Sequence, residues 1–549
     1  MSVSDMHGSA VKRRNMAGAD APHQLSRLLI TGAVAFCGIM LLAGIYGRLM
    51  NYGLRRDEMM FVPPAAFLPG WDLYQDFFYN HVPNSAWYFK GVNLFLGEAG
   101  LLFAARFGVF LGWLGLVGSV FWVTLRISKN RIFAFFCAVA MITADPLLGE
   151  AGMAASNNLL PLPFAVLGLG LFIMETLKQQ VNARFLFCAG VCLSIAAGMK
   201  ISAVVFIPPV AIAAFLLPLH MGLADRFKRV VFPLLVGGLI GALPLFWYLI
   251  SDPELFLAHV IGFHLGPHIA YWDANAYTEP NLAMGLGGKL LLAYGGWLAG
   301  VPLIMGVVAT YLVWVALRDK STGHVREEGY FGQLLVCFGA ICLAILMSFS
   351  PTPGFPQYYV LPLVCLPIFC AVVFRRISPD SQRAIVPLLG ASMLVMMVLA
   401  APRLGAGVLA LTQPDKLTVS RISTDAQRLN QIIVQDHGLT GPVASFLPIY
   451  PLEADLPVYA EFASGQFAYR IVPHTAPELA AQYTMVGEDG LDALFAQTPP
   501  AAFLLGYAEA LEGPMLRYAQ ANGYQLLEGE RFENRYGPGQ LYIRTRGGE

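Results

Sequence analysis

Four consecutive charged residues at positions 55–58 directly follow a long apolar segment. A carboxylate such as Asp57 or Glu58 can take a proton from an attacking hydroxyl, and cations such as Arg55 and Arg56 can stabilise an anion that leaves. The alternative is that the four charges only mark the end of a membrane span and pair with one another. Because each such charge costs about 2.5–3.5 kcal/mol at a bilayer centre, both interpretations place them at an interface or in a wet cavity.

The segment that carries these charges continues to about residue 100 and is rich in Trp, Tyr and Phe. It also contains the ionisable residues Asp72, Asp76, His81 and Lys90. Ordinary connections have a median of about four to six residues, and long ordered loops are usually functional. Acids and cations together suit a reaction that deprotonates one partner and stabilises an anion on the other.

The composition places these residues in a membrane protein. The 549 residues are 56% hydrophobic and 13% charged, whereas a soluble domain is about 25% charged. The formal net charge of +0 gives no sign of a nucleic-acid partner. All eight cysteines lie inside apolar runs, which favours packing over disulfides or a zinc site.

About eleven segments have the length and apolar character of a spanning helix, which needs about 20 residues. They are Leu28–Met50, Leu101–Leu125, Ile132–Leu148, Leu159–Leu177, Phe185–Met199, Ile201–Leu219, Val230–Ile250, Lys289–Leu317, Phe331–Ser348, Tyr358–Phe374 and Ile385–Leu411. Only Lys200 separates the fifth from the sixth, so these two form either a tight hairpin or one broken helix.

Basic residues set the expected orientation, because they are retained on the cytoplasmic side. They cluster in the N-terminal tail and in alternate loops, at Lys12–Arg14, Arg126–Arg131, Lys178–Arg184, Arg226–Arg229, Arg318–Arg326 and Arg375–Arg383, whereas 251–288 and 351–357 have none. We therefore predict a polytopic α-helical membrane protein with its N-terminus inside and its C-terminus outside. Residues 1–27 would be a cytoplasmic tail, 28–411 the transmembrane domain with its first outer loop at 51–100, and 412–549 a periplasmic α/β domain.

Within 412–549, the pattern predicts several short elements. Thr424 and Gln427 have the spacing of a capping box that opens an amphipathic helix. Apolar runs at Val443–Leu447, Ala501–Leu505, Tyr524–Leu527 and Leu541–Ile543 predict strands. A helix is expected around Met515–Ala521, because Asn522-Gly523 is a typical helix stop.

Several short motifs resemble one family when their order is considered. An Asp-Glu pair after the first span precedes Gly70-x-x-Leu73-Tyr74-x-Asp76 and an aromatic segment around Pro83; later come Arg106, Gly198-Met199-Lys200 and the PQYYVLP of Pro356–Pro362. This series is similar to the bacterial GT-C membrane glycosyltransferases, the aminoarabinose-transferase-like and protein-O-mannosyltransferase-like enzymes. The resemblance covers nearly the whole chain.

The resemblance implies a sugar donor linked to a polyprenyl phosphate, and an acceptor hydroxyl on a glycan, glycolipid or protein at the periplasmic face of a bacterial inner membrane. Asp57 would be the general base of an inverting displacement, with Glu58 as its alternative. Candidate contacts to phosphate or sugar are Arg55, Arg56, Asp76, His81, Lys90, Arg106, Lys200 and Tyr358. No cofactor is expected.

Two departures from the family pattern leave the donor open. Met59 and Met60 stand where the aminoarabinose enzymes have an arginine, and His81 stands where they have a lysine. The second outer loop offers Asp145 or Glu150, with Asn157 and Asn158 where an acid often stands, so a divalent metal has no support.

Two other classes of function remain open. A transporter or flippase of lipid-linked sugars should have ionisable residues near mid-membrane or internal repeats, whereas here the charges gather at helix ends. A non-catalytic membrane scaffold would not need the group of acids and cations.

Overall fold

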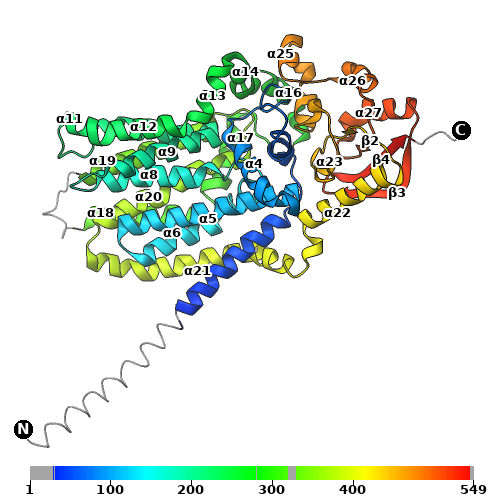
Figure 1. The fold of residues 1–549 in the computed structure, drawn as a ribbon. Helices are drawn as coiled ribbons and strands as arrows, with labels where there is room; N and C mark the ends of the chain where they lie inside the picture. Colours follow the sequence, from blue (N-terminus) through cyan, green and yellow to red (C-terminus); the bar gives the residue numbers. More distant parts are fainter. Residues whose placement is uncertain (1–28, 30, 280, 320–328, 545–549) are drawn as a thin grey trace, which may run out of the picture.

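The computed structural model describes residues 29, 31–279, 281–319 and 329–544. The predicted cytoplasmic tail, and the basic residues Lys320 and Arg326, lie outside these residues. Most of the described chain forms a bundle of helices, and a smaller domain with a sheet lies at one end of it (Figure 1).

Helices occupy each of the eleven predicted apolar segments. In chain order they are Thr31–Met50, α5 (Leu101–Ser128), α6 (Arg131–Thr143), α8 (Pro161–Thr176), α9 (Ala183–Met199), α10 (Ile207–Leu216), α12 (Phe232–Gly241) with α13 (Leu243–Ser251), α17 (Leu286–Trp297) with α18 (Gly300–Arg318), α19 (Gly329–Phe349), α20 (Leu361–Arg376) and α21 (Pro379–Ala410). The fifth and sixth segments are separate helices, because Lys200 has an extended backbone and a short 3₁₀ helix, Ile201–Phe206, precedes α10.

Six of the described helices are long and apolar enough to cross a membrane, and a seventh span results if Leu223–Gly241 and Leu243–Ser251, bent by 60°, count as one. Four further apolar helices are shorter: Arg131–Thr143, Pro161–Thr176, Ala183–Met199 and Ile201–Leu216. The chain is thus a helical membrane protein, while eleven spans with the N-terminus inside remain a prediction.

One predicted segment, Lys289–Leu317, is two helices rather than one. Gly300 has a φ of +55°, a conformation that favours glycine, and α18 begins there after α17 has ended at Trp297. A Cβ at Gly300 would lie 2.0 Å from Oδ2 of Asp145. That same carboxylate accepts a hydrogen bond from the backbone N–H of Val301 at 3.0 Å, so the break is fixed by the second outer loop.

Glycines bring the first and last helices of the bundle together. A Cβ at Gly47 would lie 2.0 Å from the carbonyl oxygen of Gly407, and a Cβ at Gly407 would lie 2.0 Å from that of Gly44. Small residues at such a crossing let two membrane helices approach closely. This crossing lies one turn before the end of the first helix, and it therefore helps to fix where the charged residues 55–58 begin.

The C-terminal domain contains a four-stranded sheet in the order β1-β2-β4-β3. Its strands are β1 (Val443–Ala444), β2 (Ala502–Leu505), β3 (Tyr524–Asn534) and β4 (Gly537–Arg544), with β1 and β2 parallel and the other pairs antiparallel. The predicted strands are confirmed, but β3 and β4 form a longer hairpin than their apolar centres indicated. The predicted helix at Met515–Ala521 is the end of α27 (Glu509–Ala521).

The predicted capping box at Thr424 is wrong. The helix there, α22, spans Thr418–Asn430, and Thr424 lies in its interior. The buried face already includes Val419 and Ile422 before Ala426 and Leu429, so the amphipathic pattern extends further back than the capping motif suggested.

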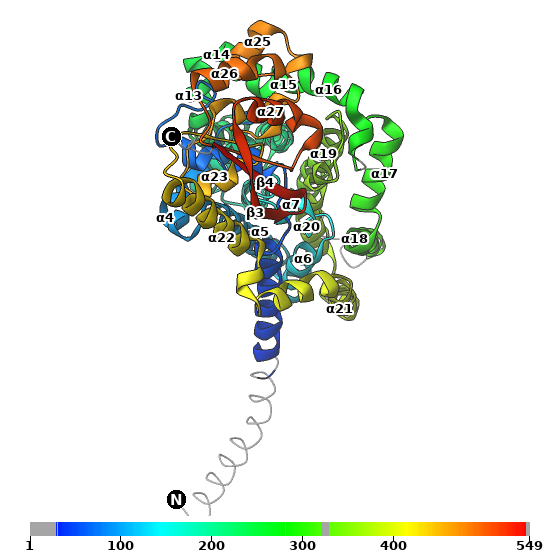
Figure 2. The same cartoon turned by 90° about the vertical axis from the view of Figure 1, so that its right-hand side faces the viewer.

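The C-terminal domain docks on the loops at one end of the bundle, and Figure 2 views the molecule from this domain. Glu453 accepts a hydrogen bond from the N–H of Leu102 at 2.9 Å, and Thr418 Oγ1 donates to the carbonyl of Asn51 at 3.1 Å. The hydroxyl of Tyr483 donates to the carbonyl of Ala258 at 2.7 Å. The first outer loop, with its short helices α2 (Glu58–Phe61), α3 (Pro64–Phe67) and α4 (Asn84–Leu96), lies at this junction.

Candidate active site

Asp57 immediately precedes helix α2 and is half-buried. Its side chain does not cap the helix, so the carboxylate is not committed to the backbone of α2. Burial raises its pKa above the ordinary value, and the positive charges of Lys200 and Arg470 oppose this effect. Asp57 is therefore a carboxylate with an increased affinity for a proton, and its charge interacts with a cation from the bundle and a cation from the C-terminal domain.

Glu150 is a second acid close to Asp57, and it begins the short helix α7 (Glu150–Met153). Its carboxylate lies 3.8 Å from the guanidinium of Arg55. Burial and the negative charge of Asp57 raise the pKa of Glu150 to about 7. A carboxylate whose proton affinity is raised by a neighbouring acid is frequent in catalytic sites, although structural networks also produce it.

Lys200 enters the site from the junction between α9 and the following 3₁₀ helix. Its ammonium group donates a hydrogen bond to Oδ1 of Asn158 and lies 5.0 Å from the ring centroid of Tyr358. Gly198 is required just before it, because a Cβ there would lie 2.2 Å from the amide nitrogen of Asn84 on α4. The Gly-Met-Lys motif thus lets α4 and α9 approach closely, and their contact positions Lys200.

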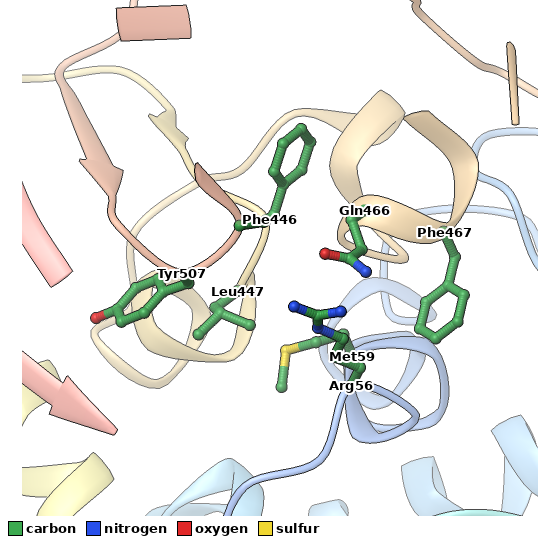
Figure 3. A pocket seen from close by; sticks show the side chains of 8 residues that line it. Arg56, Met59, Phe446, Leu447, Gln466, Phe467 and Tyr507 are labelled. Carbon is green, nitrogen blue, oxygen red and sulfur yellow. The ribbon is translucent and has the colours of Figure 1, made fainter. Parts of the chain in front are cut away.

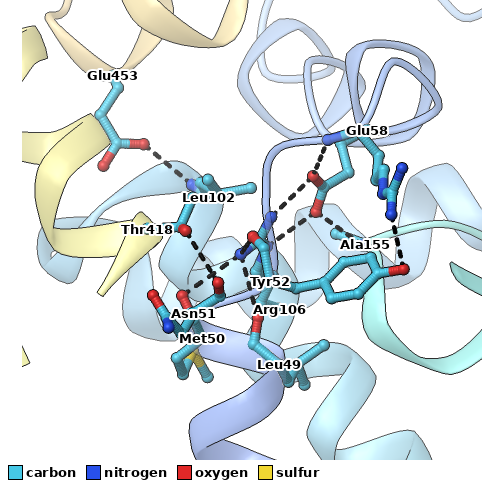
Figure 4. A network of polar contacts seen from close by, with 11 residues as sticks. Leu49, Met50, Asn51, Tyr52, Glu58, Leu102, Arg106, Ala155, Thr418 and Glu453 are labelled. Carbon is cyan, nitrogen blue, oxygen red and sulfur yellow. Dashed lines mark hydrogen bonds and ion pairs between the residues drawn. The ribbon is translucent and has the colours of Figure 1, made fainter. Parts of the chain in front are cut away.

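Glu58 and Arg106 form a fully buried ion pair beside Asp57 (Figure 4). Arg106 Nε and Nη2 donate to the two carboxylate oxygens, each at 2.9 Å. The backbone N–H groups of Arg55 and Ala155 donate to the same carboxylate at 2.8 and 2.9 Å. Because Glu58 is completely enclosed and has four donors, the geometry favours a positioning role over the expected role as an alternative base.

The remaining nitrogen of Arg106 binds the end of the first helix. Nη1 donates to the carbonyls of Leu49, Met50 and Tyr52, at 3.1, 3.4 and 2.6 Å (Figure 4). Arg106 thereby connects the first helix and α5, and through Glu58 it also connects α2 and the second outer loop. We expected a contact to substrate here, but the side chain has no exposed surface.

Arg56 points away from the bundle into a narrow crevice between α2 and the C-terminal domain (Figure 3). Its guanidinium lies 4.9 Å from the ring of Tyr536. Gln466, in the amide orientation that satisfies its neighbours, accepts hydrogen bonds from Arg56 at 3.1 Å and from Arg470 at 3.2 Å. Two guanidinium groups therefore share one neutral oxygen at this interface.

His81 lies on the other side of α2, stacked on Phe61 with ring centroids 4.6 Å apart. The ring of His264 is 5.7 Å away, and that of His268 lies a further 5.7 Å beyond it. Burial and the neighbouring imidazole and ammonium groups lower the pKa of His81 well below its ordinary value. We therefore expect a neutral imidazole at this position.

Lys90 and Asp76 do not join this group. Lys90 donates to the carbonyl of Leu68 at 3.2 Å and packs 4.6 Å from the ring of Trp87 on its own helix. Asp76 is exposed and accepts a hydrogen bond from the N–H of Asp72 at 2.6 Å. Both residues organise the first outer loop, and their predicted contacts to substrate have no support in these positions.

Sequence reasoning missed Arg470 and did not assign Glu150 or Asn158 to the site. Glu150 and Asn158 belong to the second outer loop, where only a metal ligand was considered. Arg470 follows an Ala-Tyr pair in a segment that otherwise has little charge, and an isolated arginine in apolar surroundings was the available signal. Within the described ranges, no three His, Cys, Asp or Glu side chains are placed to hold a metal ion.

The architecture, a helical bundle with polar loops beneath a small α/β domain, is a fold already seen in solved membrane proteins. ArnT from Cupriavidus metallidurans, solved bound to undecaprenyl phosphate, superimposes with a TM-score of 0.58 at 16% identity, covering 93% of this chain and 98% of that chain. Its apo structure gives 0.59 at 16% identity over 94% and 98% of the two chains.

The oligosaccharyltransferase of Archaeoglobus fulgidus, solved with a tethered acceptor peptide, gives a lower TM-score of 0.46 at 11% identity, covering 93% of this chain and 74% of that chain. No family model matches the sequence. No curated protein matches it either.

Proposed function

We propose that this protein is a glycosyltransferase that moves a sugar from a polyprenyl-phosphate donor to an acceptor hydroxyl. Asp57 is the general base, and the reaction inverts the anomeric centre. The observation that carries the proposal is the half-buried Asp57 carboxylate, which is not used to cap α2 and whose charge interacts with the cations Lys200 and Arg470. In an inverting displacement the base must reach the acceptor hydroxyl, on the opposite side of the anomeric carbon from the departing phosphate, and a cation must lie beside that phosphate.

The proposed reaction is a single displacement. The acceptor oxygen attacks the anomeric carbon, its proton passes to the Asp57 carboxylate, and the bond from the anomeric carbon to the phosphate oxygen breaks. The electron pair of that bond leaves with the lipid phosphate. Because the second pKa of a phosphate monoester is about 6, this group leaves without a general acid, and a nearby cation is sufficient to stabilise it.

We assign Lys200 to the lipid phosphate. It ends a bundle helix, next to Asp57, where a phosphate attached to a membrane-embedded chain arrives. Tyr358 and Asn158 hold its ammonium group in place. The similarity of the fold to ArnT solved with undecaprenyl phosphate supports a donor of this class. We further propose that the site faces the periplasm from a bacterial inner membrane.

The test is transfer of labelled sugar by purified variants in detergent. Asp57→Asn retains the shape of the side chain but cannot accept the proton, so we expect turnover to fall by about 10²–10⁴-fold, the usual contribution of a general base. Asp72→Asn, an exposed acid of the same loop, is the matched control and should retain wild-type turnover. If Asp57→Asn retains more than about a tenth of the activity, Asp57 is not the base.

The same variant separates the rival functions. In a flippase, Asp57→Asn would leave movement of lipid-linked sugar between leaflets of proteoliposomes intact, and no transfer product would form with the wild-type protein. A scaffold would give neither movement nor product. The acids and cations lie at helix ends and in the adjoining C-terminal domain rather than in the middle of a bundle helix, which favours a transferase over both.

A further inference from the structure

Arg470 is a buried cation without a paired acid. Its side chain is 7% exposed, and the rings of Tyr271, Trp272 and Phe467 lie 4.7, 4.8 and 4.6 Å from its guanidinium. Among the described residues no carboxylate forms an ion pair with it. Burial and the nearby charge of Arg56 lower the pKa of Arg470 to about 10, against the attraction of Tyr271, Asp57 and Glu279, neither of the two acids being close enough for an ion pair. A charge held in this way is costly unless an anion meets it.

Arg470 and two neighbouring residues each have a buried polar atom that is not used. Nε of Arg470, Nε1 of Trp272 and Nδ1 of His268 are buried, and none has a hydrogen-bond partner in the described part of the chain. The ring of His268 lies 6.4 Å from that of Trp272, and both residues are on α16 (Pro267–Asn275). Since buried polar groups are almost always bonded, this group has the character of a site that a ligand completes.

The position of Arg470 separates this site from that of Lys200. Arg470 follows α24 (Gln466–Tyr469) in the C-terminal domain, whereas Lys200 ends a helix of the bundle. The negative charge of Asp57 interacts with both cations. A phosphate on a membrane lipid reaches the base from the side of the bundle, so an anion at Arg470 belongs to the molecule that arrives from the side of the C-terminal domain.

We propose that Arg470, Trp272 and His268 bind a carboxylate or phosphate substituent of an acidic acceptor saccharide. The guanidinium supplies the charge, and the indole and imidazole N–H groups complete the shell of donors. The identity of the ligand as an acceptor saccharide rests on the proposed function. The binding of an oxyanion at Arg470 stands on the contacts alone.

Binding of two matched pairs of probes to the purified full-length protein tests the proposal. Trigalacturonate is compared with its methyl ester, and mannose 6-phosphate with mannose, so that the neutral member of each pair lacks the anionic group and the two pairs distinguish carboxylate from phosphate. We expect the acidic member of at least one pair to bind about tenfold or more tightly than the neutral one, as the loss of a charged hydrogen bond predicts. Arg470→Gln should abolish this preference and Arg470→Lys should retain part of it.

Two further variants distinguish loss of the binding site from loss of folding. Trp272→Phe removes the N–H group together with the five-membered ring and keeps one aromatic ring, so it should weaken binding of the acidic probe; because Trp272 is buried, thermal unfolding of this variant is measured alongside. Arg517→Gln removes an arginine of the same domain whose exposed partner is Glu488, and it should retain the full preference. Equal binding of both members of each pair, no binding of any probe, or an unchanged preference in Arg470→Gln overturns the proposal.

Competition with undecaprenyl phosphate distinguishes this site from the lipid-phosphate site. We expect the lipid not to displace the acidic probe, and displacement would show that Arg470 serves the donor instead. Binding of undecaprenyl phosphate that is lost in Lys200→Ala tests the donor part of the proposed function separately. If the protein binds no undecaprenyl phosphate but retains its preference for acidic probes, the proposed donor fails and the oxyanion site stands.

Discussion

Arg106 and Glu58 are joined by two hydrogen bonds of 2.9 Å, with no exposed surface on either side chain. Glu58 is the residue next to Asp57, and Arg106 lies near the start of α5. The pair therefore fixes the backbone that presents Asp57, while Asp57 itself remains half-buried and free of the helix cap. Adjacent acids thus have different roles because only one of them is completely paired.

Removing one partner of this pair should destabilise the protein. Glu58→Gln leaves the Arg106 charge uncompensated, and we expect the free energy of unfolding to fall by about 3–5 kcal/mol. Thermal unfolding in detergent measures this effect. The double variant Glu58→Leu with Arg106→Met should lose less stability than Glu58→Gln, because it leaves no unpaired charge. An unchanged unfolding temperature in Glu58→Gln would contradict a structural role for the pair.

Activity should depend on pH through the two coupled acids. Asp57 acts as a base only when deprotonated, so the rate should rise with pH through its raised pKa. Glu150 has a pKa of about 7, raised in part by the charge of Asp57, and by the same repulsion a charged Glu150 makes deprotonation of Asp57 harder. Glu150→Gln removes that charge and should move the acid limb of kcat/KM to lower pH. Glu254→Gln, which changes an exposed acid, is the control. If the acid limb does not move in Glu150→Gln, the charge of Glu150 does not affect deprotonation of Asp57.

Lys200→Ala should weaken use of the donor more than it disturbs folding. Loss of a charged hydrogen bond costs about 1.5–3 kcal/mol, so we expect binding of undecaprenyl phosphate to fall by roughly ten- to a hundredfold. Lys228→Ala, an exposed lysine outside the site, should bind the lipid as the wild type does. Wild-type affinity in purified Lys200→Ala would rule out the assignment of the phosphate to this residue.

The orientation of the chain can be measured directly. Because basic residues retain loops in the cytoplasm, we expect alkaline phosphatase fused after Glu549 to be active, since this reporter works only outside the cytoplasm. Bright fluorescence from green fluorescent protein fused at the same position would show that the orientation is the reverse of the predicted one. It would also place Asp57 on the cytoplasmic side.

The sequence by itself determined the class of fold and the region of the site. Its apolar segments are long enough, and its charges sparse enough, to cross a membrane. Segments of this length form helices in lipid, because a helix pairs its own backbone N–H and C=O groups. The charges at 55–58 mark one end of that bundle because they cannot lie at its centre. The strands of the C-terminal domain were also readable, since short apolar runs between turn residues are local signals.

Tertiary structure decided which of the candidate residues act together. Asp57 and Glu58 are neighbours with similar side chains, and only the packing of α5 shows that Arg106 encloses one of them. Lys200 and Arg470 are 270 positions apart in sequence numbering, yet both attract Asp57. Burial and the distance between charges set the affinity of a carboxylate for a proton, and both depend on contacts between distant segments, which no local pattern encodes.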